Sequence, residues 1–291
     1  VCELWLPRVS SAAAAPPVIV YEHSLHGGRG ENASLCAELA SHGFVVVAAD
    51  SARLVDAGAP PAADFAALGG ARSPFPRLTE WTRVRSRAVG ELLDRLQSAL
   101  PGLRADWRRV GVIGYSFGGA VALAAAASDP RVRAAVNIDG LVFCCCADCV
   151  CPLRHLDAPP LLIDQRLPEW LVGELPPDSP CPPESYRQMV IASELALRTL
   201  LARAGGYRLV VHGAGHGHFN DSAYRDPLHW LRAGGRAHDQ AGVSALVRRH
   251  AAAYFRLLLM RRESALLGRD VYGASYDFTS HAPAAAAGGA G

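Results

Sequence analysis

The stretch Gly111-Val-Ile-Gly-Tyr-Ser-Phe-Gly-Gly119 decides the fold, because it joins a buried strand to an Ala-rich helix through a turn at Ser116. It contains Gly-x-Ser-x-Gly, in which the glycines allow close packing of helix on strand and the serine hydroxyl is held out. The start of the helix aims the backbone N–H of Phe117 at negative charge that develops beside the serine. A glycine turn with a surface serine is the alternative, and the flanking strand and helix favour a nucleophile.

Strands and helices alternate along the rest of the chain. Runs of Val, Ile and Leu without polar alternation predict strands buried on both faces, at residues 18–21, 44–49, 110–114, 134–138, 161–164 and 207–212. Helical stretches are predicted between and after them, at 33–41, 83–99, 119–127, 184–204 and 243–260. This order predicts an α/β fold with a mostly parallel, doubly wound sheet.

The domain organisation follows from the segments that break this pattern. Residues 1–268 are expected to form a single domain, with a loop rich in Ala, Pro and Gly at 53–79 and a Pro-rich loop at 165–183, both of which are expected to choose the substrate. A Cys-rich insert is expected at 143–151, and an Ala/Gly-rich tail at 269–291 is expected to be disordered.

Charge and composition exclude several classes of protein. The net charge is +2, without the clustered basic excess of a nucleic-acid-binding protein. Every basic residue is Arg, so mechanisms that need a catalytic lysine are excluded. No apolar run is long enough to span a membrane and no signal peptide is visible. The chain begins with Val, as a truncated or processed form would, so its compartment is left open.

Five of the eight cysteines lie in the short segment 144–151. Cys146 and Cys149 form a Cys-x-x-Cys pair, which raises the possibility of a zinc site. No second pair or paired histidines stand at zinc-finger spacing, so free or partly oxidised thiols are favoured. We therefore expect no metal and no cofactor.

A serine nucleophile needs a histidine base and an acid that orients the histidine, in the chain order Ser, acid, His. His216 lies in the Gly-flanked run Gly213-Ala-Gly-His-Gly-His-Phe-Asn-Asp221 just past a predicted strand, and His218 is the alternative base. Asp139 and Asp164 each end a predicted strand. The residues alone slightly favour Asp164 as the acid and leave the choice open.

Six segments, in order, resemble the platelet-activating-factor acetylhydrolases of the plasma and type II kind, which are lipid esterases with the α/β-hydrolase fold. They are Glu3–Pro7, His23–Arg29, Leu39–Val47, Gly114–Gly119, Asn137–Gly140 and Gly215–Asp221. The resemblance covers roughly residues 3–260, with gaps at the two long loops. It implies an α/β-hydrolase fold that lacks the first edge strand or strands.

The resemblance also implies roles for particular residues. The family takes its acid from the strand after the serine's helix, about 23 residues past the serine, which makes Asp139 the acid. His23-Ser-Leu-His-Gly-Gly-Arg29 stands where the family has its oxyanion loop, so the backbone N–H of Leu25 is expected to join that of Phe117 as an oxyanion donor. Ser24 and His26 replace glycines that are usual in the family.

The predicted activity is hydrolysis of a carboxylic ester through an acyl-Ser116 intermediate. The resemblance implies a small-molecule or lipid ester, and above all the short or oxidised sn-2 acyl group of a glycerophospholipid. The alternatives are another α/β-hydrolase (dienelactone-hydrolase-like, cutinase-like or polyester-cleaving) and a non-catalytic binding protein. Residues 243–260 offer an amphipathic face for transient lipid contact, although packing on the sheet is favoured. The oligomeric state is left open.

Overall fold

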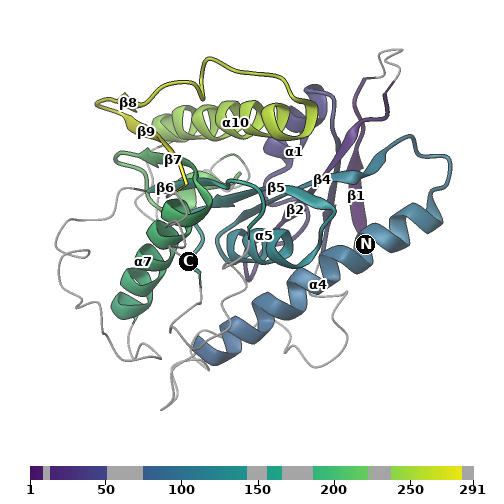
Figure 1. Ribbon diagram of the computed structural model, residues 1–291, viewed down its shortest axis with the longest axis horizontal. Helices are drawn as coiled ribbons and strands as arrows, with labels where there is room; N and C mark the ends of the chain where they lie inside the picture. The colour runs from purple at the N-terminus through teal and green to yellow at the C-terminus, as the bar shows by residue number, and fades with distance from the viewer. Residues whose placement is uncertain are drawn as a thin grey trace, which may run out of the picture.

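A mostly parallel sheet of nine strands forms the centre of the protein in a computed structural model (Figure 1). The structure describes residues 1–8, 14–50, 75–142, 156–165, 186–221, 224 and 237–283. The strands are β1 (Cys2–Trp5), β2 (Pro17–Glu22), β3 (Val45–Ala49), β4 (Asp106–Tyr115), β5 (Val132–Ile138), β6 (Leu161–Gln165), β7 (Gly206–Val211), β8 (Val271–Tyr272) and β9 (Tyr276–His281). Their order across the sheet is β1-β3-β2-β4-β5-β6-β7-β9-β8.

Strands β2 to β7 are parallel to one another, and the antiparallel pairings, which involve β1, β8 and β9, lie at the two edges of the sheet. The helices are α1 (Ala33–Ser41), α4 (Phe75–Ala99), α5 (Phe117–Ser128), α7 (Tyr186–Ala204) and α10 (Ala237–Met260). Helices α1 and α10 cover one face, while α4, α5 and α7 cover the other (Figure 1). The prediction of a doubly wound α/β-hydrolase fold is confirmed.

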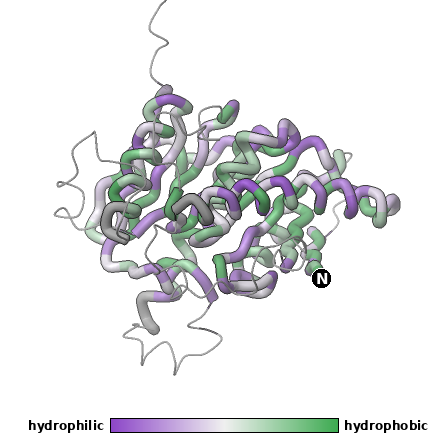
Figure 2. Tube along the Cα trace, turned by 90° about the horizontal axis from the view of Figure 1, so that it is seen from below, coloured by the Kyte–Doolittle hydropathy of each residue, from purple (hydrophilic) through white to green (hydrophobic). Residues whose placement is uncertain are grey.

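Hydrophobic side chains fill the space on both faces of the sheet. In the Cα trace coloured by hydropathy, hydrophobic segments run through the interior and hydrophilic ones through the outer helices (Figure 2). The core under α1 and α10 contains Phe44, Tyr254 and Phe255, all fully buried. Because the apolar face of α10 packs on the sheet there, it is not exposed for contact with lipid.

The prediction of a disordered tail over 269–291 is wrong for residues 271–281. Strand β9 pairs antiparallel with β7 over the whole of its length, and β8 pairs with β9. Phe278 is fully buried against the core, so this segment gains both ladder hydrogen bonds and apolar burial. Residues 284–291 lie outside the described part of the chain.

The expected loop at 53–79 is also wrong at its end, because α4 begins at Phe75 and not near residue 83. The rest of that loop, the Cys-rich insert 143–151 and residues 166–183 of the second loop lie outside the described residues.

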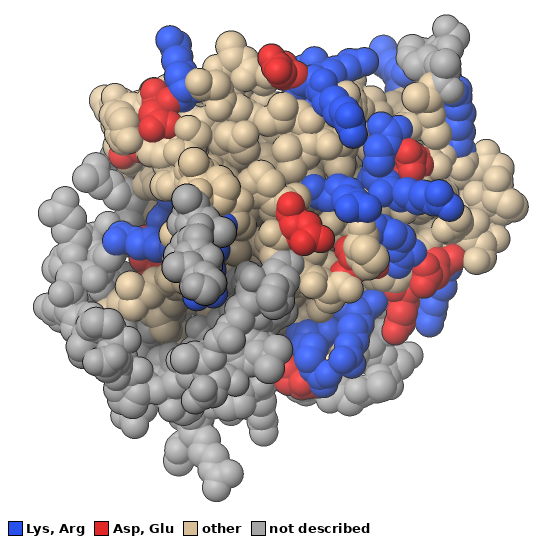
Figure 3. Space-filling model, viewed as in Figure 1, with Lys and Arg blue, Asp and Glu red and all other residues tan. Residues whose placement is uncertain are grey.

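Arginine side chains gather on the half of the molecular face that α4 crosses, with acidic side chains among them (Figure 3). Arg83 pairs with Glu80 on α4, and Arg131 pairs with Asp94 and Asp129. The Arg83–Glu80 pair is exposed, and exposed pairs contribute little to stability. Among the helices that the structure describes, none is long and apolar enough to cross a membrane.

Candidate active site

Ser116 occupies a strained turn between β4 and α5. Its φ is 56°, a left-handed conformation that is rare for a residue with a side chain and typical of a functional turn. The Ser116 N–H donates to the carbonyl of Ile138 at 2.8 Å, which holds the turn against β5. A Cβ at Gly114 would lie 2.0 Å from the carbonyl oxygen of Gly118, so only glycine allows this close crossing.

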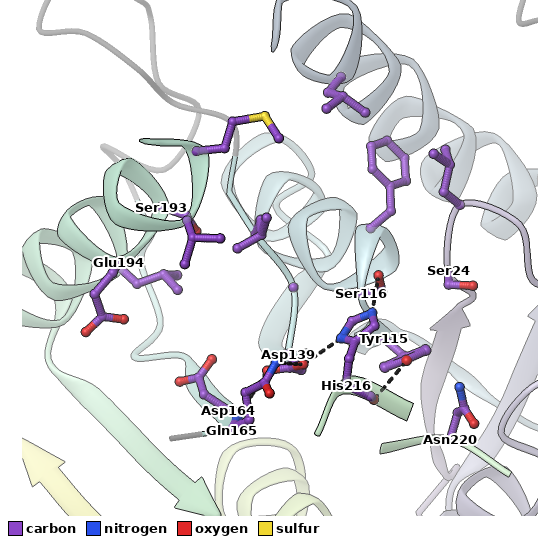
Figure 4. Close-up of a pocket in the computed structure, with 18 of the residues that line it drawn as sticks. Ser24, Tyr115, Ser116, Asp139, Asp164, Gln165, Ser193, Glu194, His216 and Asn220 are labelled. Carbon is purple, nitrogen blue, oxygen red and sulfur yellow. Dashed lines mark hydrogen bonds and ion pairs between the residues drawn. The ribbon is translucent and has the colours of Figure 1, made fainter. Parts of the chain in front are cut away.

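A chain of hydrogen bonds joins the predicted serine, histidine and Asp139 (Figure 4). The Nε2 atom of His216 lies 2.9 Å from Ser116 Oγ, and its Nδ1 lies 2.5 Å from Asp139 Oδ2. Asp139 follows β5, and His216 begins a short 3-10 helix after β7, so all three come from the carboxyl ends of parallel strands. The Asp139 side chain is 8% exposed, whereas that of His216 is 49% exposed and accessible to a substrate.

The second candidate acid, Asp164, is engaged elsewhere. Its Oδ2 accepts a hydrogen bond from Arg208 Nε at 2.9 Å, and Arg208 also binds the carboxylate of Glu194 through both terminal nitrogens. Burial, against the opposing charge of Arg208, raises the pKa of Asp164 to about 7. Of the two aspartates, the structure brings only Asp139 within hydrogen-bond distance of His216.

Two residues that contact this chain of hydrogen bonds were not identified as functional from the sequence. The side-chain amide and backbone N–H of Gln165 donate to the two oxygens of Asp139 at 3.0 and 3.1 Å. The Tyr115 ring stacks on His216 at 4.8 Å, and its hydroxyl donates to the His216 carbonyl at 2.9 Å. The signals that the sequence offered for these two residues were a polar residue at the end of a predicted strand and an aromatic residue directly before Ser116.

The alternative base, His218, lies away from the serine and accepts a hydrogen bond from the backbone N–H of Gly215. His212 lies just past β7 and contacts Asp277 of β9 at 3.0 Å. Of the three histidines, His216 is the one that contacts Ser116.

A cavity of about 420 Å³ opens over Ser116. Leu25 and Phe117, whose backbone N–H groups are the predicted oxyanion donors, both line it. Its volume is in the range of small-molecule sites. The apolar part of its lining includes Leu78, Phe117, Leu141, Met189, Val190 and Leu197. Ser24, Glu31 and Asn220 line it on the side of the loop at residues 23–31, which we call the oxyanion loop.

The described residues contain no group of three or more His, Cys, Asp and Glu side chains arranged to hold a metal ion. The Cys144–Cys151 cluster, where a zinc site was considered, lies outside those residues.

Comparisons with known proteins support the fold and a coarse activity. Residues 8–144 match the dienelactone hydrolase family. Over 92% of its length the chain is similar to a ferulic acid esterase from Streptomyces cinnamoneus, with 26% identity, a TM-score of 0.64 and coverage of 74% of that protein. Neither finding shows the narrower resemblance to the platelet-activating-factor acetylhydrolases. Together with the order of the strands, these similarities show that the chain has the α/β-hydrolase fold, and the activity that they support is hydrolysis of a carboxylic ester.

Proposed function

We propose that the protein is a serine esterase in which Ser116 is the nucleophile, His216 the general base and Asp139 the acid that orients the histidine. The observation that carries this proposal is the continuous hydrogen-bond chain from Ser116 Oγ through the His216 ring to Asp139. The strained backbone of Ser116 supports it independently, since such strain is typical of a nucleophile at this turn.

In this mechanism the Ser116 proton passes to His216 Nε2 as Oγ attacks the ester carbonyl carbon. The N–H groups of Leu25 and Phe117 bind the oxyanion, and each donor contributes roughly 3 kcal/mol to lowering the barrier. The protonated His216 gives its proton to the departing alkoxide, which leaves as an alcohol. Water then attacks the acyl-serine, with His216 again as the base, and releases the carboxylic acid.

The substrate class that fits best is an uncharged ester with a small or medium-sized apolar acyl group. The apolar side chains listed above line one part of the cavity. Arg208, which also lines it, and Arg85, which lies over the Phe117 ring, are both paired with carboxylates. The similarity to a ferulic acid esterase supports an aromatic acid as the source of this acyl group.

Short-acyl glycerophospholipids are the second candidate, favoured by the six sequence segments named above. The helix that the sequence offered for lipid contact, α10, has its apolar face in the core. A freely dissolved ester is therefore the first substrate to test.

The decisive experiment is labelling with a fluorophosphonate probe, followed by peptide mapping. We expect the label on Ser116 of the wild-type protein and none on Ser116→Ala or His216→Ala. Hydrolysis of methyl ferulate, p-nitrophenyl butyrate, a simple lactone and a short-acyl phosphatidylcholine would then rank the substrate classes. A folded wild-type protein that neither takes the label nor hydrolyses any of the four esters would refute the proposal.

A further inference from the structure

We propose that Glu31 is a positioning residue that fixes the oxyanion loop in the conformation that aims the Leu25 N–H at the reacting carbonyl oxygen. This inference rests on the proposed esterase function and adds to it a residue outside the catalytic chain of hydrogen bonds. Glu31 lies at the far end of the loop from Ser24 and lines the same cavity as Ser116.

The carboxylate of Glu31 accepts three hydrogen bonds, two of them from Ser24. The backbone N–H of Ser24 donates to Oε2 at 2.8 Å, and its hydroxyl donates to Oε1 at 2.5 Å. The hydroxyl of Tyr21, a fully buried residue of β2, donates to Oε2 at 3.1 Å. Charge-assisted bonds of this kind are shorter and stronger than those between neutral groups. Glu31 therefore ties Ser24 to the end of β2.

The bonds at Ser24 determine the direction of the next N–H. The Ser24 carbonyl and the Leu25 N–H belong to one planar trans peptide, so they point in opposite directions. The Ser24 carbonyl oxygen lies 2.6 Å from His23 Nδ1 and accepts from the Gly27 N–H at 3.3 Å. With Glu31 holding the amide and side chain of Ser24, and His23 and Gly27 holding its carbonyl, the Leu25 N–H has one orientation.

This arrangement accounts for the serine in a loop that resembles a glycine-rich one. A glycine at position 24 would offer no hydroxyl to Glu31, whereas Ser24 uses both of its donors on one carboxylate. At Gly27, by contrast, a Cβ would lie 2.3 Å from Glu31 Oε1. Gly27 thus leaves room for the Glu31 carboxylate, and Ser24 binds it.

The same residue also connects the oxyanion loop to the segment that carries His216. The Glu31 carbonyl accepts from the Asp221 N–H at 3.1 Å. The neighbouring Asn32 side chain donates to the Tyr21 hydroxyl at 3.0 Å and to the Phe219 carbonyl at 3.1 Å. The oxyanion donor and the base are therefore held on one hydrogen-bonded frame.

The test compares Glu31→Gln and Ser24→Ala with Glu38→Gln, a matched control on α1 whose side chain pairs with His42 and lies 38% exposed. An amide at position 31 would turn an N–H toward one of the donors that the carboxylate accepts. We expect kcat/KM for p-nitrophenyl butyrate to fall about 10- to 100-fold in Glu31→Gln, less than for complete loss of an oxyanion donor, with KM little changed. Ser24→Ala, which keeps its backbone N–H, should lose about three- to tenfold.

The second readout is the inhibition constant of a trifluoromethyl ketone, which forms a tetrahedral adduct with the serine and so needs the oxyanion donors. It should weaken by the same factor as kcat/KM in both variants and stay at the wild-type value in Glu38→Gln. Folded variants with wild-type kcat/KM, or with reduced kcat/KM and unchanged inhibition, would overturn the role of Glu31. If Glu31→Gln does not fold, Ser24→Ala alone decides. An inactive wild-type protein would instead overturn the esterase itself, and with it this role.

Discussion

Replacing Asp139 by Asn should abolish most of the activity, because an amide cannot satisfy the donors that surround this carboxylate. Oδ2 faces His216 Nδ1 and the Gln165 side-chain amide, and Oδ1 faces the Gln165 backbone N–H. An Asn nitrogen at Oδ2 would itself donate to Nδ1, so His216 would carry its proton on Nε2 and could not accept one from Ser116. An Asn nitrogen in the place of Oδ1 would instead face the Gln165 backbone N–H, so that two donors would meet without an acceptor. A wrong tautomer of this kind costs about 10⁴-fold in kcat, or about 5 kcal/mol of barrier.

Asp164→Asn is the matched comparison, since it makes the same change at the end of the next strand. Its carboxylate binds Arg208, which keeps both bonds to Glu194 when Asp164 is neutral. We expect kcat/KM within about tenfold of the wild type. Hydrolysis of p-nitrophenyl butyrate gives the rates, and circular dichroism shows that both variants are folded. A loss larger in Asp164→Asn than in Asp139→Asn would refute the assignment of the acid.

Three further variants test other parts of the structure. Tyr115→Phe keeps the ring stacked on His216 but removes its hydrogen bond, so kcat/KM should fall about tenfold; an unchanged rate would argue against a positioning role. Burial and the charge of Arg85 lower the pKa of His23 to about 4. Between pH 4 and the unfolded pKa of about 6.5, the unfolded chain therefore binds more protons than the folded protein. The wild-type protein should therefore lose about 3 kcal/mol of stability as the pH falls through that window, and His23→Asn should lack this component in urea unfolding; parallel curves would contradict it. Phe278→Ala should destabilise the fold by about 3–5 kcal/mol in the same assay, and a change below about 1 kcal/mol would mean that β9 does not belong to the core.

The parallel part of the sheet was predictable because its strands are buried on both faces and read as continuous apolar runs. Val45–Ala49, for example, is entirely buried and contains no polar residue. Strand β9 contains the polar residues Asp277, Thr279 and Ser280 beside Tyr276 and Phe278, and it is followed by an Ala/Gly-rich segment. Its pairing with β7 depends on contacts far away in the sequence, which local composition does not report.

Within the candidate site, Ser116 and His216 were predictable from local glycine patterns at strand ends. The acid was not predictable from residue type, because Asp139 and Asp164 both end parallel strands that lie side by side. What separates them is Arg208 on the next strand, which pairs with Asp164 across the sheet. Glu31 was missed for a related reason, since its contacts with Ser24 and Tyr21 form only when the oxyanion loop folds back on β2.

The position of β9 also has a consequence for how the protein is made. Residues 276–281 pair with residues 206–211, the strand directly before His216, and are synthesised long after Ser116 and Asp139. During translation Ser116 and Asp139 can take their places in the growing parallel sheet while the strand before His216 still lacks its outer neighbour. A nascent chain stalled before residue 276 would therefore carry a serine without a properly supported base. Hydrolytic competence should therefore arise only once residues 276–281 have left the ribosome, and not when the segment that carries His216 emerges.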